Sequence, residues 1–482
     1  MFVLLIFAII LFYFYSRKNH DYWKIRKVVH EEPIPLFGNN FGNYIGKYSW
    51  TEDASRLYYK YPDEKVVGNY KGNKPELIIR DPDLVRQVLN VDFMYFYNRG
   101  LGRDPTVEPL LLNLFHADGD RWKLLRQRLT SAFTVSKLKA MFPLIIKCAQ
   151  RLQTLTSDLA ANKDEYDVRE LMARFTTEFI GACGFGIEMD TLNNEQSLFR
   201  ELGRNIFTRS RKSILLFILK DLFPELANSI KPMNPAIEEV IFEILQKIRE
   251  QRNFKPSGRN DFVDLLLELE NKGKISVESI EKHNSDGSPF IVEMEMDFKM
   301  QAAQLFVFFA AGFETSSSAT SFTLHLLAYH QEIQNKVHEE IEEVLSRYNN
   351  TLSYDAVKDM DLLSRCFKET LRIFPSLGIL NRTCTRKYTI PDLNITIDPG
   401  VKIIIPVMAM QNDEKYFDNP KEFNPDRFLD ENFKNINKYL YFPFGEGPRM
   451  CVGKACMKRN VEVREASELY QDCGKRRDNL ID

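Results

Sequence analysis

A glycine-broken loop that ends in a lone cysteine constrains this chain of 482 residues more than any other feature. In the segment Phe444-Gly-Glu-Gly-Pro-Arg-Met-Cys-Val-Gly453, Cys451 follows Arg449 by two residues. Gly445 and its neighbour at 447 permit left-handed backbone turns, so the loop can fold back and bring its amides near one sulfur atom. Such amides, with the positive end of a helix that begins just after the cysteine, favour the thiolate form. The loop therefore predicts a fixed thiolate with an arginine beside it.

Four further motifs precede this loop in the chain. They are Trp122-Lys-Leu-Leu-Arg126, Ala311-Gly-Phe-Glu-Thr-Ser316, Glu369-Thr-Leu-Arg372 and Phe423-Asn-Pro-Asp-Arg427-Phe428. Together with the cysteine loop, and in this order, they resemble the motifs of the cytochrome P450 monooxygenases. The resemblance extends to Gly453 and is greatest to insect microsomal members that oxidise plant toxins and insecticides. It implies a cytochrome P450 fold, mainly α with a small β portion, and haem b (iron protoporphyrin IX) as the cofactor.

The resemblance also assigns the residues that hold the cofactor. Cys451 is the expected axial ligand of the haem iron, in a loop shaped by Phe444, Gly445 and Gly453. Four side chains are expected to bind the two haem propionates, because the planar guanidinium group matches a carboxylate in a two-point contact. They are Trp122, Arg126, Arg382 and Arg449.

A second part of the expected site lies in the segment Asp297–Tyr329. This segment has no proline and is apolar nearly all round, which predicts a buried helix. A glycine and a run of hydroxyl residues interrupt it at positions 312–318. Such residues are unexpected in a helix interior, because glycine disfavours the helix and hydroxyls form hydrogen bonds to its carbonyl groups. By resemblance, Thr315 offers a hydroxyl to oxygen at the iron and Glu314 helps to deliver protons, while Ala311 and Gly312 leave room for the cofactor. The alternative is a structural kink with a solvated Glu314.

Glu369 and Arg372 are three residues apart and therefore neighbours on a helix. The resemblance predicts that they form a buried charge network with Arg427 that fixes the position of the cysteine loop. The alternative from spacing alone is an exposed helix pair, which contributes only about 0.3 kcal/mol.

The first residues predict a membrane anchor. Phe2–Tyr15 is continuously apolar, which is short for a hydrocarbon core of about 30 Å and fits the core of a signal peptide equally well. No basic residue precedes this run, several follow it, and no small-residue cleavage site is visible, so an anchor with a cytosolic catalytic body is favoured. We expect an anchor at 1–16, a basic and proline-containing hinge at 17–36, a monooxygenase domain at 37–453 and an atypical tail at 454–482. The expected location is the endoplasmic reticulum membrane.

Composition excludes several other classes. The formal net charge is −2 with interspersed signs, which gives no support for nucleic-acid binding. Seven cysteines without regular spacing favour a reducing compartment over a disulfide framework. Zinc binding by Cys451, Cys456 and Cys473 is disfavoured, because there is no paired C-x-x-C spacing and no nearby histidine.

Hydrophobic periodicity predicts most of the secondary structure. Helices are expected over Asp120–Leu129, Lys137–Leu155, Ala236–Gln251 and Tyr354–Ile373. Further strands of a small sheet are expected at Ile395–Ile397 and Val401–Val407, besides a hairpin of Val66–Tyr70 with Leu77–Arg80. The polar segment His283–Pro289 predicts a surface loop.

The expected activity is insertion of one oxygen atom of O2 into an apolar small molecule. Electrons are expected from NADPH through a separate NADPH-cytochrome reductase, with cytochrome b5 as a further donor, because the chain has no flavin or nicotinamide fingerprint. A basic face for an acidic electron-transfer partner is one interpretation, and a solvated charge run the other, for Lys123, Arg128, Lys137 and Lys139. A reductase-independent hydroperoxide isomerase is a second hypothesis, against which the Glu314–Thr315 pair weighs.

A third hypothesis is a non-catalytic splice or gene-model variant that cannot retain haem. Residues 454–482 contain 7 basic and 6 acidic residues, whereas the family continues with an amphipathic helix over the haem and a terminal hairpin. Few apolar groups are available to the helix, and charged residues such as Arg459 and Glu465 interrupt its apolar face. We expect a short helix to about Tyr470, no counterpart of the hairpin in Gln471–Asp482, and weak haem retention.

Overall fold

The computed structural model describes most of the chain. The described residues are 7, 12–101, 104–162, 165–187, 189–194, 197–208, 210–223, 229–259, 261–459, 461–463 and 465–466. Most of the predicted anchor Phe2–Tyr15 lies outside them, although residues 12–17 are helical. The predicted absence of a hairpin in Gln471–Asp482 also concerns residues outside the described part.

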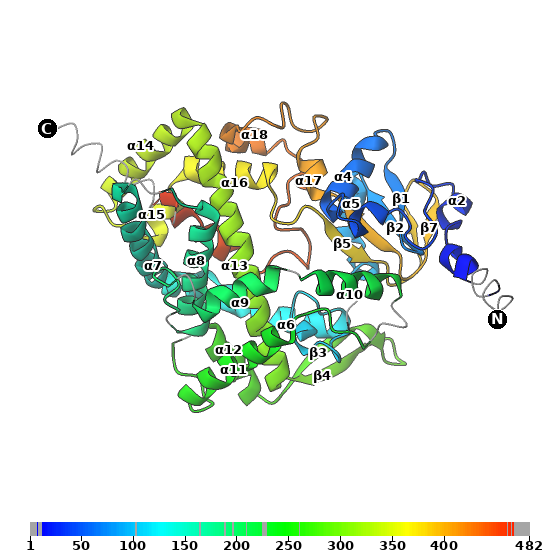
Figure 1. The fold of residues 1–482 in the computed structure, drawn as a ribbon, viewed down its shortest axis with the longest axis horizontal. Helices are drawn as coiled ribbons and strands as arrows, with labels where there is room; N and C mark the ends of the chain where they lie inside the picture. The colour runs from blue at the N-terminus through cyan, green and yellow to red at the C-terminus, as the bar shows by residue number, and fades with distance from the viewer. Residues whose placement is uncertain are drawn as a thin grey trace.

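Helices dominate the described residues, as the resemblance predicts (Figure 1). The α-helices are α2 (Tyr22–Ile25), α3 (Phe41–Tyr44), α4 (Trp50–Lys60), α5 (Pro82–Arg86), α6 (Gly119–Leu129), α7 (Val135–Asn162), α8 (Val168–Ile180), α9 (Leu198–Phe207), α10 (Arg211–Leu222), α11 (Pro235–Gln251), α12 (Phe262–Asn271), α13 (Phe298–Tyr329), α14 (Gln331–Arg347), α15 (Tyr354–Lys358), α16 (Asp361–Ile373), α17 (Val407–Gln411) and α18 (Asp430–Phe433). Short 3₁₀ or π turns are η1 (Gln87–Val91), η2 (Phe93–Tyr95), η3 (Pro109–Leu112), η4 (Thr130–Phe133), η5 (Gly181–Phe185) and η6 (Pro425–Phe428).

The strands form three small sheets in the described part of the chain. They are β1 (Val66–Lys71), β2 (Lys74–Ile79), β3 (Lys274–His283), β4 (Pro289–Glu295), β5 (Leu380–Thr383), β6 (Tyr388–Ile390), β7 (Ile395–Ile397) and β8 (Lys402–Ile405). The largest sheet has the order β1-β2-β8-β5, in which β2 and β8 are parallel and the other pairs antiparallel. It lies with α4 and α5 toward the N-terminal end of the molecule, whereas α7, α8, α14 and α15 lie at the other end and α13 passes between the two (Figure 1).

The periodicity predictions hold for most elements and fail in two places. The predicted hairpin is β1–β2, with bounds moved by one to three residues. The predicted strands Ile395–Ile397 and Val401–Val407 are β7 and β8, but they belong to different sheets. The predicted helix Tyr354–Ile373 is two helices, α15 and α16, separated at residues 359–360.

The central helix α13 is a continuous 32-residue helix. Its N-cap residue Asp297 accepts a hydrogen bond from the amide of Met300 at 2.7 Å, which satisfies one of the free N–H groups of the first turn. Its hydroxyl residues bond back to carbonyls of the preceding turn, as predicted; for example, Thr320 Oγ1 donates to Ser316 O at 3.0 Å. These bonds let a polar run lie inside a buried helix.

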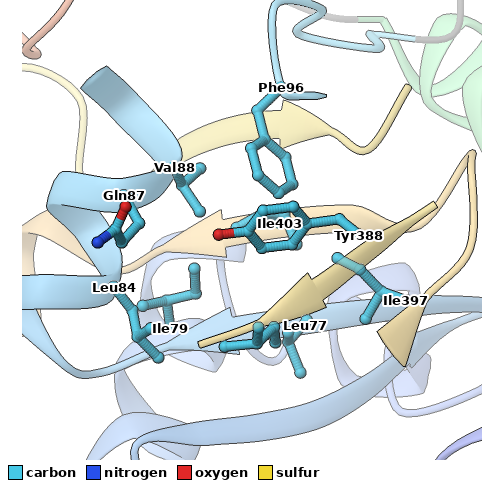
Figure 2. Close-up of a pocket in the computed structure, with 10 residues that line it drawn as sticks. Leu77, Ile79, Leu84, Gln87, Val88, Phe96, Tyr388, Ile397 and Ile403 are labelled. Carbon is cyan, nitrogen blue, oxygen red and sulfur yellow. The ribbon is translucent and has the colours of Figure 1, made fainter. Parts of the chain in front are cut away.

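A small gap lies between the largest sheet and the β6–β7 ribbon (Figure 2). Its volume is about 10 Å³, roughly the space of one water molecule. Apolar side chains line it together with Gln87 and Tyr388, and they include Leu77, Ile79, Val88, Phe96 and Ile403 (Figure 2). The gap is a packing defect of this core and is too small to hold a substrate.

No single helix among the described residues combines the length and apolar character needed to cross a bilayer. One pair, Gly119–Phe133 with Val135–Asn162, meets the criteria of length and composition only when both parts are taken together, and it is bent by 55°.

Residues 454–459, 461–463 and 465–466 after the cysteine loop are helical, in agreement with the predicted short helix. Val461 and Val463 are buried, and so are the carboxylate residues Glu462 and Glu465. The sequence predicted that Glu465 would interrupt the apolar face. The structure instead places two carboxylates within the core, because the surrounding helices cover this helix on more than one side.

Candidate functional site

The cysteine loop folds back as its glycines predict. Gly445 and Gly447 have φ values of +70° and +74°, and a Cβ atom at Gly447 would lie 1.9 Å from the carbonyl oxygen of Leu89. The amide of Cys451 donates to Phe444 O at 2.9 Å, which closes the loop. The Cys451 side chain is exposed, and the helix at 454–459 begins three residues later. The loop therefore presents one sulfur at the positive end of a helix.

Two opposing effects act on the Cys451 thiol in the chain without a cofactor. Burial by the surrounding protein raises the pKa of the thiol, although one face of the residue stays exposed. The Gly453 amide and the positive charges of Arg126, Arg99 and Lys454 lower this pKa. The net direction of the pKa shift is upward, with burial as its largest cause. A metal ion deprotonates a thiol that coordinates it, so bound iron would favour the thiolate form of Cys451.

Helix α6 places two of the predicted residues against this loop. Arg126 Nη1 donates to the carbonyl oxygen of Met450 at 2.7 Å, directly beside Cys451. Trp122 is buried, and the Arg449 guanidinium lies over its ring at 4.4 Å from the centroid. The four-residue spacing puts both α6 side chains on the face that meets the cysteine loop.

Three arginines from separate parts of the chain meet near this loop. Burial, and then repulsion from Arg99, lowers the pKa of Arg382 to about 9. Burial, repulsion from Arg99 and repulsion from Arg382 lower the pKa of Arg449 to about 8, against the opposing effect of Asp118. Burial likewise lowers the pKa of Arg99 to about 10. Asp118 is the carboxylate that contacts the cluster, and it accepts from Arg449 Nη2 at 3.0 Å.

This arginine cluster fits the propionates of haem. Arg382 Nε and Arg449 Nη1 are buried and lack a hydrogen-bond partner among the described residues. A buried N–H group without a partner costs free energy, and two carboxylates would both accept from these groups and relieve the repulsion among the guanidinium groups. The exposed Cys451 sulfur has the chemistry of a ligand for haem iron. The donor set therefore matches haem: a thiol for the metal and guanidinium groups for its carboxylates.

Helix α13 contributes the predicted hydroxyl. Thr315 Oγ1 donates to Ala311 O at 2.6 Å, and Ala311 is exposed. Glu314 forms an ion pair with Arg169 Nη2 of α8 at 2.9 Å. At Gly312 an added Cβ atom would lie 3.0 Å from Cδ1 of Ile180, so this glycine permits close packing of α8. Of the two small residues predicted to leave room for the cofactor, Ala311 is exposed and Gly312 packs against Ile180 of α8.

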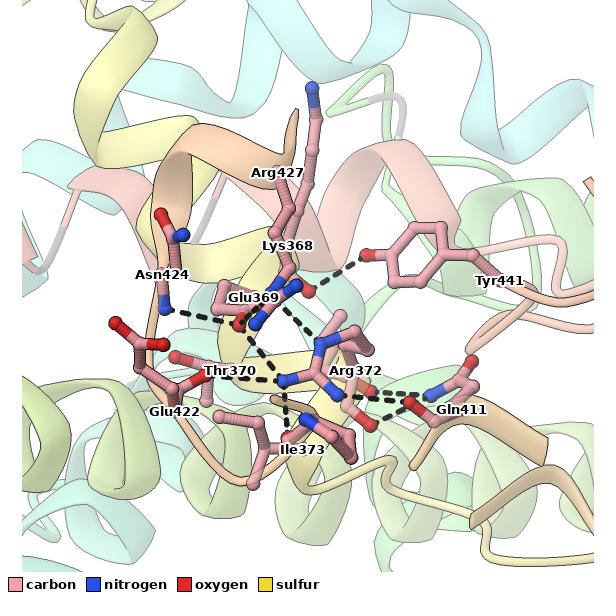
Figure 3. A network of polar contacts seen from close by, with 12 residues as sticks. Lys368, Glu369, Thr370, Arg372, Ile373, Gln411, Glu422, Asn424, Arg427 and Tyr441 are labelled. Carbon is pink, nitrogen blue, oxygen red and sulfur yellow. Dashed lines mark hydrogen bonds and ion pairs between the residues drawn. The ribbon is translucent and has the colours of Figure 1, made fainter. Parts of the chain in front are cut away.

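The predicted charge network is buried, and the exposed-pair alternative is wrong (Figure 3). Glu369 and Arg372 have side chains with no solvent exposure, and Arg427 Nε lies 3.3 Å from Glu369 Oε1. Arg372 Nη1 donates to the carbonyl oxygen of Gln411 at 2.9 Å. The Gln411 amide group in turn accepts from the backbone N–H of Phe442 at 3.2 Å. The network therefore reaches the chain two residues before Phe444.

Sequence reasoning missed Arg99 and Asp118. Asp118 accepts from the amides of Arg99 and Gly100 at 2.8 and 3.1 Å, so it holds this segment beside Arg449. Its position before α6 is a recognisable N-cap signal, yet its side chain makes no cap hydrogen bond. The sequence therefore marks Asp118 only as a helix N-cap and not as a partner of Arg449. No motif in the neighbouring sequence distinguishes Arg99.

Comparison with known proteins agrees with this geometry. The Cytochrome P450 family model matches residues 29–461. Cytochrome P450 6a2 of Drosophila melanogaster is 37% identical over 465 residues, which cover 94% of this chain and 89% of that protein. Cytochrome P450 6B2 of Helicoverpa armigera is 35% identical, covering 92% and 86%, and Cytochrome P450 6B1 of Papilio polyxenes is 33% identical, covering 94% and 89%. The extent of these matches, together with a cysteine loop and an arginine cluster suited to haem, establishes that the chain belongs to the cytochrome P450 family.

Proposed function

We propose that this chain is a microsomal monooxygenase that inserts one oxygen atom of O2 into an apolar small molecule of the plant-toxin or insecticide type. The observation that carries the proposal is the arginine cluster beside the Cys451 loop, whose unpartnered N–H groups suit the propionates of haem. Similarity to insect relatives supports the substrate class.

The site residues have two proposed roles: one set would bind haem, and the other would hold or transfer a proton. Cys451 would ligate the iron, and Arg382, Arg449 and Arg126 would surround the propionates together with Trp122. A haem with a thiolate ligand supplies the chemistry that cleaves the O–O bond. The Thr315 hydroxyl, now bonded to Ala311 O, would turn to hold a proton near the exposed face of α13. Glu314 would have to leave its ion pair with Arg169 to bring protons to Thr315.

Electrons would come from NADPH through a separate reductase, with cytochrome b5 as a further donor. The candidate docking face includes Lys123 and Lys139, which pair with Glu278 at 4.0 Å and Asp355 at 3.0 Å. Both pairs are partly exposed and individually weak, so an acidic partner can replace Glu278 or Asp355. Reversal of charge in Lys139→Glu should slow reduction by the reductase at low salt more than at high salt.

The proposed location is the endoplasmic reticulum membrane with the catalytic body in the cytosol. The support is the apolar run Phe2–Tyr15 followed by basic residues. Deletion of residues 1–15 should weaken membrane association and leave the fold intact. Protection of the body from protease in intact microsomes would overturn the orientation.

The carbon-monoxide difference spectrum of the full chain tests the central assignment. The reduced wild-type protein should show the red-shifted Soret band of a thiolate-ligated haem. Cys451→Ser should lose this band, and Cys456→Ser, which alters the next cysteine along the chain, should keep it. Survival of the band in Cys451→Ser with loss in Cys456→Ser would refute the assignment.

A second candidate is a protein of the same family with weak haem retention. The observation in its favour is the burial of Glu462 and Glu465 in the helix that follows the cysteine loop. Burial raises the pKa of Glu462, against the opposing effects of Lys458 and Arg459. A buried charge costs free energy unless its pairing is complete. The helix after Cys451 would then be less stable and would hold the cysteine loop, and thus haem, less firmly. Stoichiometric haem and normal turnover of the full chain would exclude this candidate.

A further inference from the structure

A second pocket is lined in part by Cys456 of the helix that follows the cysteine loop. Its volume is about 190 Å³, and its walls come from η4, α7, α8, α12 and α13, with Cys456 from the helix after the cysteine loop. None of the predicted haem-binding residues lines it. The pocket is therefore distinct from the site described above.

The pocket is apolar inside and polar at one end. Four phenylalanine rings line it, at positions 133, 179, 262 and 308. Phe262 and Phe308 are stacked at 4.5 Å between centroids, and Phe133 lies 6.0 Å from Phe308. Glu268 is exposed and Lys137 is half-buried, whereas Phe262 and Phe179 are buried, so the two polar residues mark the mouth.

The polar groups inside the pocket, Asp261 and the thiols of Cys456 and Cys183, do not favour binding of a charged ligand. Both carboxylate oxygens of Asp261 already accept from Arg252, at 2.8 Å each. Burial raises the pKa of Cys456 to about 12 and that of Cys183 well above its ordinary value, so both thiols are neutral at pH 7. A neutral buried thiol behaves as a small apolar group and is a poor nucleophile. A charged ligand would lose its hydration without gaining a counter-charge inside.

We propose that this pocket, which we call the Cys456 pocket, binds a neutral monocyclic arene. A cavity of about 150 Å³ lined by aliphatic and aromatic side chains stays dry and takes up benzene, so a volume of about 190 Å³ is sufficient for one substituted ring. The phenylalanine rings offer stacked and edge-to-face contacts to such a ligand.

The Cys456 pocket also borders the cysteine loop. A Cβ atom placed at Gly453 would lie 3.8 Å from Cε1 of Phe133 and 4.0 Å from Sγ of Cys451. Phe133 therefore lines the pocket and also lies beside Gly453, two residues after Cys451. An arene in the pocket restricts Phe133, and hence the loop, without entering the space beside Thr315.

Binding of fluorobenzene to the full-length chain, followed by ¹⁹F NMR, tests the proposal. Cys456→Phe fills the pocket from its inner end, and Leu265→Phe fills it from α12. Both variants should bind at least about tenfold more weakly than the wild type, the factor typical of a blocked apolar site. Cys456→Ala, which keeps the space open, should retain binding. Circular dichroism of each variant verifies the fold. If one filling variant misfolds, the other still tests the proposal.

Ala311→Leu is the control for the exposed face of α13, because it crowds the space near Thr315 and leaves the Cys456 pocket unchanged. It should leave intact the bound fluorobenzene signal that the two filling variants weaken. The proposal is overturned if the wild type does not bind, if both filling variants bind as the wild type does, or if only Ala311→Leu loses binding. The last outcome would place the arene beside Thr315.

Discussion

The Arg372 guanidinium and the Glu369 carboxylate are joined by two hydrogen bonds, from Nε to Oε2 at 2.8 Å and from Nη2 to Oε1 at 2.9 Å. Neither side chain is exposed to solvent. Arg372 also donates to Gln411 O, and Gln411 accepts from the amide of Phe442. The buried pair on α16 therefore fixes the chain that leads into the cysteine loop (Figure 3).

Glu369→Gln should destabilise the protein strongly, because it leaves the buried Arg372 guanidinium without a counter-charge. Removal of one partner of a buried pair costs about 3–5 kcal/mol. The measurement is urea unfolding of the purified chain together with its haem content, which should fall as the loop loses its support.

Asp361→Asn is a matched control on the same helix. Asp361 pairs with Arg365 at 2.8 Å but its side chain is 70% exposed, so its loss should cost at most about 1 kcal/mol. Equal losses in unfolding free energy in Glu369→Gln and Asp361→Asn would show that the buried pair contributes no more to stability than the exposed pair.

Arg382→Gln should have opposite effects on the two forms of the protein. Burial and the neighbouring Arg99 lower the pKa of Arg382 to about 9. At pH 7 the positive charge of Arg382 therefore destabilises the haem-free chain. The haem-free variant should therefore unfold at a higher temperature than wild type, whereas haem transfer to a scavenger protein should become faster. Arg386→Gln, at an exposed position four residues later, should change neither rate nor temperature. Lower stability of the haem-free Arg382→Gln protein would contradict the proposed role.

The cysteine loop was predictable because its signals are local. The left-handed turns at Gly445 and Gly447 follow from residue type, whereas the helix after Cys451 was expected from the family resemblance. By contrast, the break between α15 and α16 rests on Glu340 of another helix, whose carboxylate accepts from the amides of Leu362 and Leu363 at 2.7 and 3.0 Å. A cap supplied from a distant segment leaves no trace in the local periodicity.

The β3–β4 ribbon illustrates the same limit. Only its tip, His283–Pro289, was predicted, as a surface loop. Strand β3 is held against α6 by Asp120, whose carboxylate accepts from Ser279 Oγ at 2.8 Å and Ile280 N at 2.6 Å. The same reason applies to Arg99, which reaches the candidate site through tertiary contacts. Resemblance to a known family thus pointed to Cys451 and to three of the arginines that lie near it, but it did not predict which distant carboxylates would organise them.

Thr315→Ala should uncouple the use of NADPH from product formation. Loss of the hydroxyl removes the proton-holding group from the exposed turn of α13. A proton-transfer role predicts a loss in product per NADPH of about 10²-fold or less. Thr315→Ser, which keeps a hydroxyl at the same place, should retain most of the coupling. The role assigned to Thr315 is wrong if coupling in Thr315→Ala equals that of the wild type.

Glu462→Gln should stabilise the chain at pH 7, because it removes a charge that is buried at a cost. Burial raises the pKa of Glu462 above its ordinary value of 4.5, so the folded state binds this proton more tightly than the unfolded state does. The favourable contribution is therefore complete below about pH 4.5 and is lost as pH rises through the folded-state pKa. The wild type should lose stability over this range, and the variant should lose less.

The gain at pH 7 should be about 1–3 kcal/mol, the cost typical of an incompletely satisfied buried polar group. Urea unfolding between pH 4.5 and 7.5 measures it, with Glu414→Gln as the control at an exposed glutamate. Glu462→Gln should also hold haem more firmly, since the same helix carries the chain away from Cys451. A variant less stable than wild type at pH 7 would show that the ion pairs of Glu462 with Arg459 at 2.6 Å and Lys458 at 3.5 Å outweigh its burial.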